Sequence, residues 1–424
     1  MAAELVTFGC RLNIVESETI RRQAQAAGLT DIAIVNSCAV TSEAVRQARQ
    51  AVRRLARAQP GRPVVVTGCA AQIDPAAFAA MPETARVLGN AEKLRPENWA
   101  ALARSNSLPG GDAPCPGDKI AVGDIMAERS LDAVLQPRAD NRTRGFVQVQ
   151  NGCDHRCTFC VIPFGRGNSR SLPVADALAQ CRSLLAAGAS EIVLTGVDLT
   201  SYGRDLPEAP PLGALARAIL RALPELRRLR LSSLDAVEID DGLRDLIASE
   251  PRLMPHLHLS LQSGDDLILK RMKRRHGRDD AIRFCASMRG LRPDIAFGAD
   301  LIAGFPTEDE AMFARSLDLI EACGLSYVHV FPYSSRPGTA AARMPQVAGD
   351  VVAERAARLR ERAARAHGRH LAQRIGRPLS VLTERGNTGR AEDFTLVRFG
   401  RDVAAGEILA LSAQAADGKA LIAA

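Results

Sequence analysis

The sequence predicts an α/β protein with three parts: a parallel α/β domain, a partial barrel of six β/α units and a small all-β domain. The first two parts are indicated by short β-rich runs that alternate with helical stretches, once over residues 1–105 and again over residues 142–372. The third part is indicated by residues 373–424, where glycine-containing turns separate short β runs. Residues 106–141 are expected to form a linker, because Ser, Pro and Gly are concentrated near their start.

The first domain is expected to contain three strands, each followed by a helix. Ser42 is a suitable N-cap, because its hydroxyl can accept a hydrogen bond from a free N–H of the first helical turn. Strands and helices that alternate in this way form a parallel sheet covered by helices. The expected strands are Glu4–Phe8, Ile32–Asn36 and Pro63–Thr67, and the expected helices are Ile14–Ala27, Ser42–Ala58 and Pro75–Met81.

Six strand–helix units are expected over residues 142–372. They are too few for a closed barrel of eight strands, so we predict a partial barrel with its functional site at the C-terminal ends of the strands. The expected strands are Gly145–Gln150, Glu191–Thr195, Arg228–Ser232, His256–Leu261, Ile295–Leu301 and Ser326–Phe331. The expected helices are Val174–Ala187, Pro211–Ala222, Asp240–Ser249, Leu267–Arg274, Arg278–Met288 and Asp309–Ala322.

The last part is expected to begin after a long helix over Val352–Arg374. Three β runs follow this helix, at Leu379–Glu384, Phe394–Phe399 and Glu407–Ser412. A segment of about 50 residues has the size of a minimal β barrel, which is the structure we expect here.

The composition limits where the protein can act. The 424 residues contain no apolar run of about eighteen residues, so no membrane span is expected. The N-terminal residues lack the basic and apolar regions of a signal peptide, which favours a cytoplasmic protein. The chain has 10 cysteines, and in a large chain of this type cysteines more often bind metals or act in catalysis than form disulfides.

Positive charge is concentrated in three stretches. Residues 46–62 and 270–278 contain Arg or Lys without an acidic residue, and residues 355–377 contain Glu361 as their single acid. The net charge is +7, which is compatible with a polyanionic partner. One such stretch can be a solvated helix face, whereas three together favour a nucleic acid as the partner.

Three cysteines, Cys153, Cys157 and Cys160, follow the first expected barrel strand with the spacing Cys-x3-Cys-x2-Cys. A cubane iron–sulfur cluster has four irons, and thiolate is their usual protein ligand. Three thiolates leave one iron open to another molecule, which indicates chemistry at the cluster. Zinc is the alternative, but a structural zinc site needs four ligands, and this run lacks a second ligand pair.

A second set of cysteines is distributed over the first domain. Cys10, Cys38 and Cys69 each follow one of the three expected strands, and the carboxyl ends of parallel strands lie along one edge of a sheet. The three thiols can therefore meet in space and hold an inorganic centre. The alternative is three buried structural thiols, since free cysteine is among the most buried residue types.

The Cys-x3-Cys-x2-Cys run after the first strand of a six-unit β/α barrel resembles the radical S-adenosylmethionine (SAM) superfamily. The resemblance implies that Cys153, Cys157 and Cys160 hold a 4Fe–4S cluster whose open iron binds SAM. An electron from the cluster would then cleave SAM and produce a 5′-deoxyadenosyl radical. The resemblance also implies SAM contacts at the strand ends, namely Gly196, Asp198, Gln262, Asp300, Gly304, Phe305 and Phe331.

Over nearly the whole chain, the three parts and the two cysteine sets are similar to the methylthiotransferase family. This resemblance implies a second 4Fe–4S cluster on Cys10, Cys38 and Cys69, which holds the sulfur to be transferred, and a C-terminal TRAM-like barrel that binds RNA. It assigns no catalytic residue beyond the cluster ligands. Segments 36–41, 163–171, 231–234 and 331–339 are similar to the branch that modifies threonylcarbamoyladenosine in tRNA.

The resemblance implies an enzyme that adds a methylthio group to carbon 2 of N6-threonylcarbamoyladenosine at position 37 of tRNA. Two other branches of the family, which act on isopentenyladenosine-37 of tRNA and on ribosomal protein S12, are alternatives. A non-catalytic iron–sulfur or zinc protein that binds RNA is an alternative from a different class. For the enzyme we expect a flavodoxin- or ferredoxin-type electron donor, a monomeric chain and no membrane.

Overall fold

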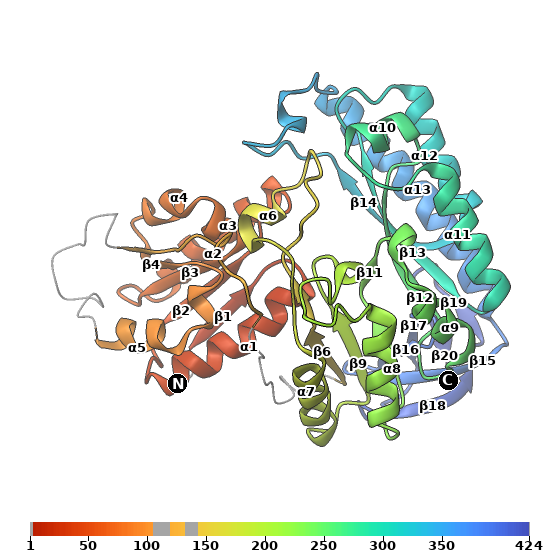
Figure 1. Ribbon diagram of the computed structural model, residues 1–424, viewed down its shortest axis with the longest axis horizontal. Helices are drawn as coiled ribbons and strands as arrows, with labels where there is room; N and C mark the ends of the chain where they lie inside the picture. Colours follow the sequence, from red (N-terminus) through yellow and green to blue (C-terminus); the bar gives the residue numbers. More distant parts are fainter. Residues whose placement is uncertain (1–2, 105–118, 132–142, 424) are drawn as a thin grey trace. The chain divides into compact units, whose positions relative to one another are not determined.

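The computed structural model describes residues 3–104, 119–131 and 143–423. Most of the expected linker, including Ser105–Pro116 and Cys115, therefore lies outside the described residues. The chain divides into two compact units, each assembled from separate stretches of sequence (Figure 1). The first unit comprises Met1–Gln136, Asn151–Arg170 and Ser334–Thr339, and the second comprises Pro137–Gln150, Ser171–Tyr333 and Ala340–Ala424.

The first unit is built on a parallel sheet whose strands follow one another in space in the same order as in the sequence. The strands are β1 (Glu4–Thr7), β2 (Ala33–Ser37), β3 (Val64–Gly68), β4 (Thr84–Leu88) and β5 (Ile120–Ala121). Every residue of β2 and β3 is buried. Strands buried on both faces have continuous apolar runs, which explains the three consecutive valines of β3. The parallel sheet predicted for this part of the chain is confirmed.

Helices pack on both faces of this sheet. The helices of this unit are α1 (Arg11–Ala26), α2 (Ser42–Ala58), α3 (Cys69–Ile73), α4 (Pro75–Ala79), α5 (Pro96–Arg104) and α6 (Ile162–Arg166), with a 3-10 helix at Glu92–Leu94. Ile20 of α1 and Trp99 of α5 share one core with Val65. Val52 of α2 shares a second core with Val66, whose side chain points to the opposite face of the sheet.

The N-cap of α2 differs from the prediction. Thr41 is the N-cap: its backbone is extended, and its hydroxyl accepts a hydrogen bond from the Ala44 N–H at 3.1 Å. The prediction of Ser42 as the cap is therefore wrong by one residue. Ser42 is the first helical residue instead, and both its N–H and its hydroxyl lie 3.1 Å from the Ser334 hydroxyl.

The second unit contains parallel strands that alternate with helices, as predicted, but they form two sheets. Their orders are β10-β9-β6 and β11-β12-β13-β14, and the interruption falls at Ser232. The strands are β6 (Arg144–Gln148), β9 (Glu191–Thr195), β10 (Leu229–Leu231), β11 (Ser233–Leu234), β12 (His256–Gln262), β13 (Ala296–Ala303) and β14 (Leu325–Pro332). The helices are α7 (Val174–Ala186), α8 (Leu212–Ala222), α9 (Asp241–Ser249), α10 (Asp266–Arg271), α11 (Arg278–Leu291) and α12 (Glu310–Ala322).

The C-terminal part of the second unit is a mainly antiparallel sheet, ordered β18-β15-β16-β17-β20-β19. Its strands are β15 (Pro378–Glu384), β16 (Thr388–Ala391), β17 (Leu396–Phe399), β18 (Ile408–Ser412), β19 (Ala415–Ala416) and β20 (Leu421–Ala423). Phe394 was expected to begin a strand, but its backbone is left-handed, with a φ of +72°. This conformation is incompatible with a strand, so β17 starts two residues later.

Helix α13 (Gly349–Arg374) leads into this sheet and packs against β14. It is the longest helix among the described residues, and it carries many arginines. None of the helices in the described part of the chain is both long and apolar enough to cross a membrane.

Within the second unit, buried arginines of β10 and the residue before it contact the C-terminal sheet. Arg228 donates to the backbone oxygen of Ser380 at 2.6 Å, and Arg230 donates to that of Glu392 at 3.1 Å. Arg230 also pairs with buried Glu191 at 3.0 Å. Burial alone would raise the pKa of Glu191, but Arg230 outweighs this effect and the pKa is lowered. The buried charges are tolerated because each has a partner.

Asp393 connects the C-terminal sheet to α13. Its carboxylate is 1% exposed and lies 3.0 Å from Arg374 Nε and 3.4 Å from His370 Nε2. Burial alone would raise the pKa of Asp393, but His370 and Arg374 outweigh this effect and hold the pKa well below its usual range. Asp393 is therefore ionised in the folded protein across the working pH range.

We predict that Asp393→Asn destabilises the protein at neutral pH. The amide keeps the shape of the side chain but removes the negative charge beside Arg374, so the free energy of unfolding should fall by about 2 kcal/mol. Because the folded pKa of Asp393 is depressed, its stabilisation is complete above the unfolded pKa of about 3.9 and is lost as the pH falls through the folded value. Urea titrations at pH 7, 5 and 3 should therefore show that the difference in unfolding free energy between the wild type and Asp393→Asn becomes smaller at pH 3.

Asp402→Asn is the matched control. Asp402 is an exposed residue between β17 and β18 of the same sheet, and it accepts a hydrogen bond from the Asn387 amide at 2.8 Å. This substitution should leave the urea midpoint unchanged at every pH. Equal midpoints for wild type and Asp393→Asn at pH 7 would contradict the role assigned to Asp393.

Candidate functional site

Cys153, Cys157 and Cys160 lie on one loop of the first unit, and we call them the loop triplet. The Cys153 N–H donates to the Gly167 oxygen and the Cys160 N–H to the Cys157 oxygen, both at 3.1 Å. Gly152 begins the loop with a φ of +73°, a conformation that favours glycine. All three cysteines are partly exposed, so a loop with a fixed backbone presents three thiols.

The chemistry of the loop triplet fits an iron–sulfur cluster that has an open iron. Thiolates are the usual iron ligands, and hydrogen bonds to the sulfurs tune the potential of such a cluster. The Ile162 N–H lies 3.4 Å from Cys160 Sγ and can make a bond of this kind. Arg156 adds a positive charge to the loop and donates to the Cys153 oxygen at 2.8 Å.

Cys10, Cys38 and Cys69, which we call the sheet triplet, stand just beyond the carboxyl ends of β1, β2 and β3, as predicted. A Cβ placed on Gly9 would stand 2.8 Å from Cys38 Sγ, so the chain next to Cys10 lies against Cys38. Burial raises the pKa of Cys38 to about 11, and the thiols of Cys69 and Cys10 add to the shift. Three thiols from distant parts of the sequence therefore lie at one edge of the sheet.

Glycine is required where the sheet edge brings Cys38 and Cys69 together. Gly68, directly before Cys69, has a φ of +95°, and a Cβ there would collide with the backbone of Ser37. Since Ser37 directly precedes Cys38, the two segments meet backbone to backbone. The Ser37 hydroxyl also accepts the Ala71 N–H at 3.2 Å, which fixes the first turn of α3.

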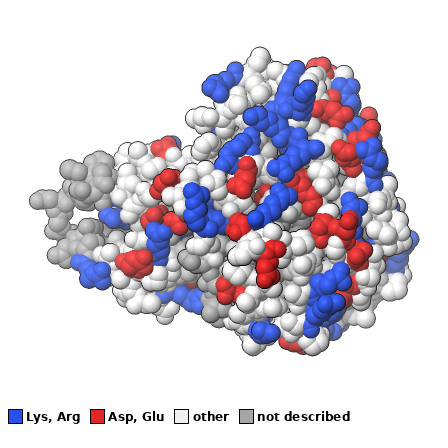
Figure 2. Space-filling view, in the orientation of Figure 1, with Lys and Arg blue, Asp and Glu red and all other residues white. Residues whose placement is uncertain are grey.

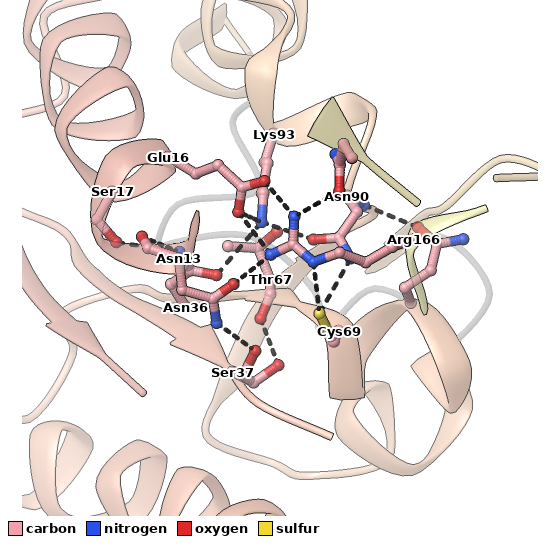
Figure 3. Close-up of polar contacts among 12 residues, drawn as sticks. Asn13, Glu16, Ser17, Asn36, Ser37, Thr67, Cys69, Asn90, Lys93 and Arg166 are labelled. Atoms are coloured by element: carbon pink, nitrogen blue, oxygen red, sulfur yellow. Dashed lines mark hydrogen bonds and ion pairs between the residues drawn. The ribbon is translucent and has the colours of Figure 1, made fainter. Parts of the chain in front are cut away.

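A buried group of charged side chains lies beside the sheet triplet (Figure 3). The Arg166 guanidinium pairs with the Glu16 carboxylate at two points, with distances of 2.5 Å for Nη1–Oε1 and 3.0 Å for Nη2–Oε2. Lys93 Nζ lies 2.8 Å from Glu16 Oε2. All three side chains are at most 2% exposed, so the Arg166 guanidinium and the Lys93 amine hold the Glu16 carboxylate away from water.

Arg166 also reaches the sheet triplet. Its Nε lies 3.3 Å from Cys69 Sγ, and the amide nitrogen of Asn90 lies 3.6 Å from the same sulfur. Burial alone would raise the pKa of Glu16, but Arg166 and Lys93 outweigh this effect and hold the pKa at about 2. A guanidinium is charged at any working pH, so Cys69 stands beside a fixed cation.

The sequence prediction does not include this charged group. One signal was available: Asn13 and Glu16 are polar residues on the buried side of α1, three positions apart, and buried polar groups need partners. The identity of those partners has no local signal. Lys93 is 77 residues from Glu16 in the sequence, and Arg166 is 150 residues from it.

In the second unit, two of the expected SAM-binding residues lie in a turn after β9. A Cβ placed on Gly196 would stand 2.8 Å from Gln150 Oε1, and the same oxygen accepts the Asp198 N–H at 2.8 Å. The Asp198 carboxylate accepts hydrogen bonds from the hydroxyls of Thr200 and Ser201, at 3.3 and 2.7 Å. The turn is therefore fixed from both sides.

Four further expected residues lie at the ends of β12, β13 and β14. Gln262 has a φ of +67° and lies at a shift in the register between β12 and β13; this conformation is rare for a residue other than glycine. Gly304 has a φ of +74°, and its N–H donates to Glu308 at 2.8 Å. Phe305 is fully buried, whereas Phe331 is half-buried.

Asp300, the remaining expected residue, lies on β13 between two histidines that the sequence prediction does not include. His258 Nε2 of β12 and His329 Nδ1 of β14 lie 2.9 and 3.1 Å from Asp300 Oδ1. Burial alone would raise the pKa of Asp300, but the two histidines outweigh this effect and hold the pKa well below its usual range. The Asp300 carboxylate therefore orients two imidazoles.

Comparison with known families agrees with this geometry. Residues 147–320 match the family model described as radical SAM superfamily, and residues 2–89 match the model described as uncharacterized protein family UPF0004. The first range contains the loop triplet, and the second contains the sheet triplet. These matches define a radical SAM protein that carries a second family domain over residues 2–89.

Similar proteins specify the family within this class. The chain is 46% identical to the threonylcarbamoyladenosine tRNA methylthiotransferase MtaB of Rickettsia prowazekii, over 96% of this chain and 93% of that protein. It is 34% identical to MtaB of Thermotoga maritima, over 89% and 85% of the two chains. It is 33% identical to the tRNA-2-methylthio-N(6)-dimethylallyladenosine synthase of Cereibacter sphaeroides, over 89% and 86%. The chain belongs to the radical SAM methylthiotransferase family.

Solved structures support the fold alone. The radical SAM methyltransferase TsrM from Kitasatospora setae superposes with a TM-score of 0.53 at 18% identity, over 76% of this chain and 67% of that one. The cobalamin-dependent radical SAM enzyme OxsB superposes with a TM-score of 0.51 at 13% identity, over 86% and 56%. The likeness confirms the predicted α/β architecture with parallel sheets.

We predict that Gly68→Ala prevents the sheet triplet from binding iron while the loop triplet still binds it. The new Cβ would collide with the backbone of Ser37, so Cys38 or Cys69 must move. After anaerobic reconstitution, the iron content per chain should fall to about half of the wild-type value, that is by one 4Fe–4S cluster.

Gly61→Ala is the matched control for this prediction. Gly61 has a φ of +86°, but a Cβ there would meet nothing within 4 Å, so the substitution adds the same backbone strain without a collision. Gly61→Ala should retain the wild-type iron content. A wild-type iron content in Gly68→Ala would show that the sheet triplet does not bind iron in the arrangement described.

Proposed function

We propose that this protein modifies tRNA by transferring a methylthio group to carbon 2 of N6-threonylcarbamoyladenosine at position 37. The observation that carries the proposal is the presence of two cysteine triplets in one compact unit. The MtaB relatives support the substrate, since identity to the Rickettsia prowazekii enzyme is 46% over almost the full length of both chains. The dimethylallyladenosine synthase of Cereibacter sphaeroides, at 33%, makes isopentenyladenosine-37 the second candidate substrate.

Carbon 2 of adenine is neither acidic nor electrophilic enough for ordinary acid–base chemistry, so the reaction needs a radical cofactor that the protein orients. When bound, a 4Fe–4S cluster on the loop triplet would supply the electron that cleaves SAM, and a second 4Fe–4S cluster on the sheet triplet would supply the sulfur. The protein contributes three thiols at each place. Each triplet thus leaves one iron position for another molecule.

We assign SAM binding to the strand ends of the second unit. Glycine at positions 196 and 304 lets a ligand approach the backbone closely, and the fixed turn at Asp198 can receive the ammonium group of methionine. The left-handed Gln262 and the hydrogen-bonded Asp300 present polar groups from neighbouring strands. The complete set is Gly196, Asp198, Gln262, Asp300, Gly304, Phe305 and Phe331.

We assign tRNA binding to basic side chains that lack an acidic partner. On α13, Arg358 pairs with Glu310 at 2.6 Å, and most other arginines of this helix also have acidic partners. Helix α13 therefore offers less free charge than its sequence indicates. On α2, Arg53, Arg54 and Arg57 are exposed, and no ion pair is recorded for them within the described residues, so they are free to contact phosphates.

In the second unit, the corresponding residues are Lys270 and Lys273, which are exposed on and beside α10. Figure 2 shows Lys and Arg side chains gathered over the region where α10 lies in Figure 1. Phosphate contacts of this type release counterions, so tRNA binding should weaken steeply with salt. We further propose that the C-terminal sheet over 373–424 is a TRAM-like RNA-binding domain, distinct from the SAM domain over 142–372 and the cluster domain over 1–105.

Because the substrate is tRNA, we place the enzyme in the cytoplasm, where it would act as a monomer. A flavodoxin- or ferredoxin-type protein is the electron donor that fits a low-potential iron–sulfur cluster. The donor must reach the loop triplet, whose partly exposed cysteines allow such an approach.

Nucleoside analysis tests the proposed substrate. In a strain that lacks this gene, the 2-methylthio form of threonylcarbamoyladenosine should be absent from digested tRNA, and threonylcarbamoyladenosine itself should remain. The wild-type gene should restore the methylthio form, as measured by mass spectrometry. Undiminished 2-methylthio-threonylcarbamoyladenosine in the deletion strain, or loss of the isopentenyl derivative instead, would contradict the assignment.

Loss of each cysteine triplet should block a different step of the reaction. We predict that a chain with Cys153→Ala, Cys157→Ala and Cys160→Ala forms no 5′-deoxyadenosine from SAM and dithionite. A chain with Cys10→Ala, Cys38→Ala and Cys69→Ala should still form 5′-deoxyadenosine but no methylthiolated tRNA. Chromatography of the small molecules measures 5′-deoxyadenosine, and mass spectrometry of the digested tRNA measures the methylthio group. Formation of 5′-deoxyadenosine without the loop triplet would overturn its role in SAM cleavage.

A further inference from the structure

We propose that Arg166, held in place by Glu16, is a positioning residue that gives the sheet-triplet cluster a fixed positive charge and thereby raises its reduction potential. The inference rests on the proposed function, because it requires a cluster on Cys10, Cys38 and Cys69. It assigns a role to a side chain that is not an iron ligand.

The orientation of the guanidinium is fully determined by its hydrogen bonds. Arginine has five N–H donors in a rigid fork, and the structure provides an acceptor for each. Nη1 donates to Glu16 and to Asn151, Nη2 donates to Glu16 and to Asn13, and Nε donates to Cys69 Sγ at 3.3 Å. The four bonds of the two Nη atoms therefore aim the fifth donor at the sulfur.

The charge balance of this group favours an anion beside Arg166. Arg166 shares the Glu16 carboxylate with Lys93, whose pKa is lowered by burial, and the other partners of the two side chains, such as Asn90 and Asn151, are neutral amides. Excess charge in a buried site is costly unless an opposite charge is present. Among the groups that Arg166 contacts in the described part of the chain, the Cys69 sulfur can supply this negative charge, as a thiolate ligand of an anionic cluster.

A cation at this distance acts on the reduction potential in a known direction. Reduction adds an electron to the cluster, and a nearby positive charge stabilises the more negative state, the more so where water is excluded. Hydrogen bonds to the cluster sulfurs act in the same direction. Arg166 supplies both effects through Nε, and the Asn90 amide supplies a weaker hydrogen bond.

Arg166 also has a structural position that must be separated from its charge. It is the last residue of α6, which begins two residues after Cys160, and it contacts Glu16 of α1, which begins directly after Cys10. Loss of Arg166 could therefore disturb both triplets. A useful test must change the charge in both directions, with at least one variant that keeps the shape of the side chain.

The test uses a parent chain with Cys153→Ala, Cys157→Ala and Cys160→Ala, which can hold only the sheet-triplet cluster. Arg166→Gln removes a positive charge but also shortens the side chain, whereas Glu16→Gln removes a negative charge at nearly constant shape. A redox titration followed by electron paramagnetic resonance measures the midpoint potential. For Arg166→Gln, the ratio of reduced to oxidised cluster at a fixed potential should fall about tenfold, which is about 59 mV for a one-electron couple.

Glu16→Gln should shift the midpoint in the opposite direction, and Arg166→Lys, which keeps the charge, should stay close to the parent. A purely structural role would move the two glutamine variants in the same direction or not at all, and either result overturns the inference. If Arg166→Gln does not bind iron, Glu16→Gln decides: an upward shift supports the inference, and no shift overturns it. A parent chain that binds no iron would overturn the proposed second cluster itself, which is a distinguishable failure.

Discussion

The buried pair of Arg166 and Glu16 is the interaction on which the arrangement of the first unit depends. Glu16 belongs to the helix that follows Cys10, and Arg166 ends the helix that follows Cys160. A charge in this position is unstable unless it is paired and hydrogen-bonded, so the two helices must meet in one geometry. The same guanidinium contacts Cys69. One ion pair thus fixes segments that carry both cysteine triplets.

The topology of the sheet explains why the sheet triplet can exist. Parallel strands place their carboxyl ends at one edge, so Cys10, Cys38 and Cys69 become neighbours although helices separate them in the sequence. Gly68 permits the closest approach, because any side chain there would collide with the backbone of Ser37. The second unit follows the same principle, since its expected SAM-binding residues also stand at or near strand ends. In both units, strand direction therefore determines where these candidate site residues lie.

The sequence was sufficient to predict those parts of the fold and of the candidate site whose signals are local. The apolar runs of the strands, the helices between them and the cysteine after each strand could all be identified from neighbouring residues. The N-cap was missed by one position because Thr41 and Ser42 are both good caps, and tertiary contacts decide between them. The partners of Glu16 could not be predicted, since Lys93 and Arg166 reach it only after the sheet has formed. The break at Ser232 likewise depends on pairing between strands.

The most direct measurement of the central claim is the position of iron in crystals of the anaerobically reconstituted protein. Anomalous diffraction at the iron edge should show two separate iron peaks, one bounded by Cys153, Cys157 and Cys160 and the other by the sheet triplet beside Arg166. The irons at each peak should be bound by three cysteine sulfurs of this chain. A single peak at the loop triplet, with free thiols at Cys10, Cys38 and Cys69, would contradict the account and leave this protein without a second cluster.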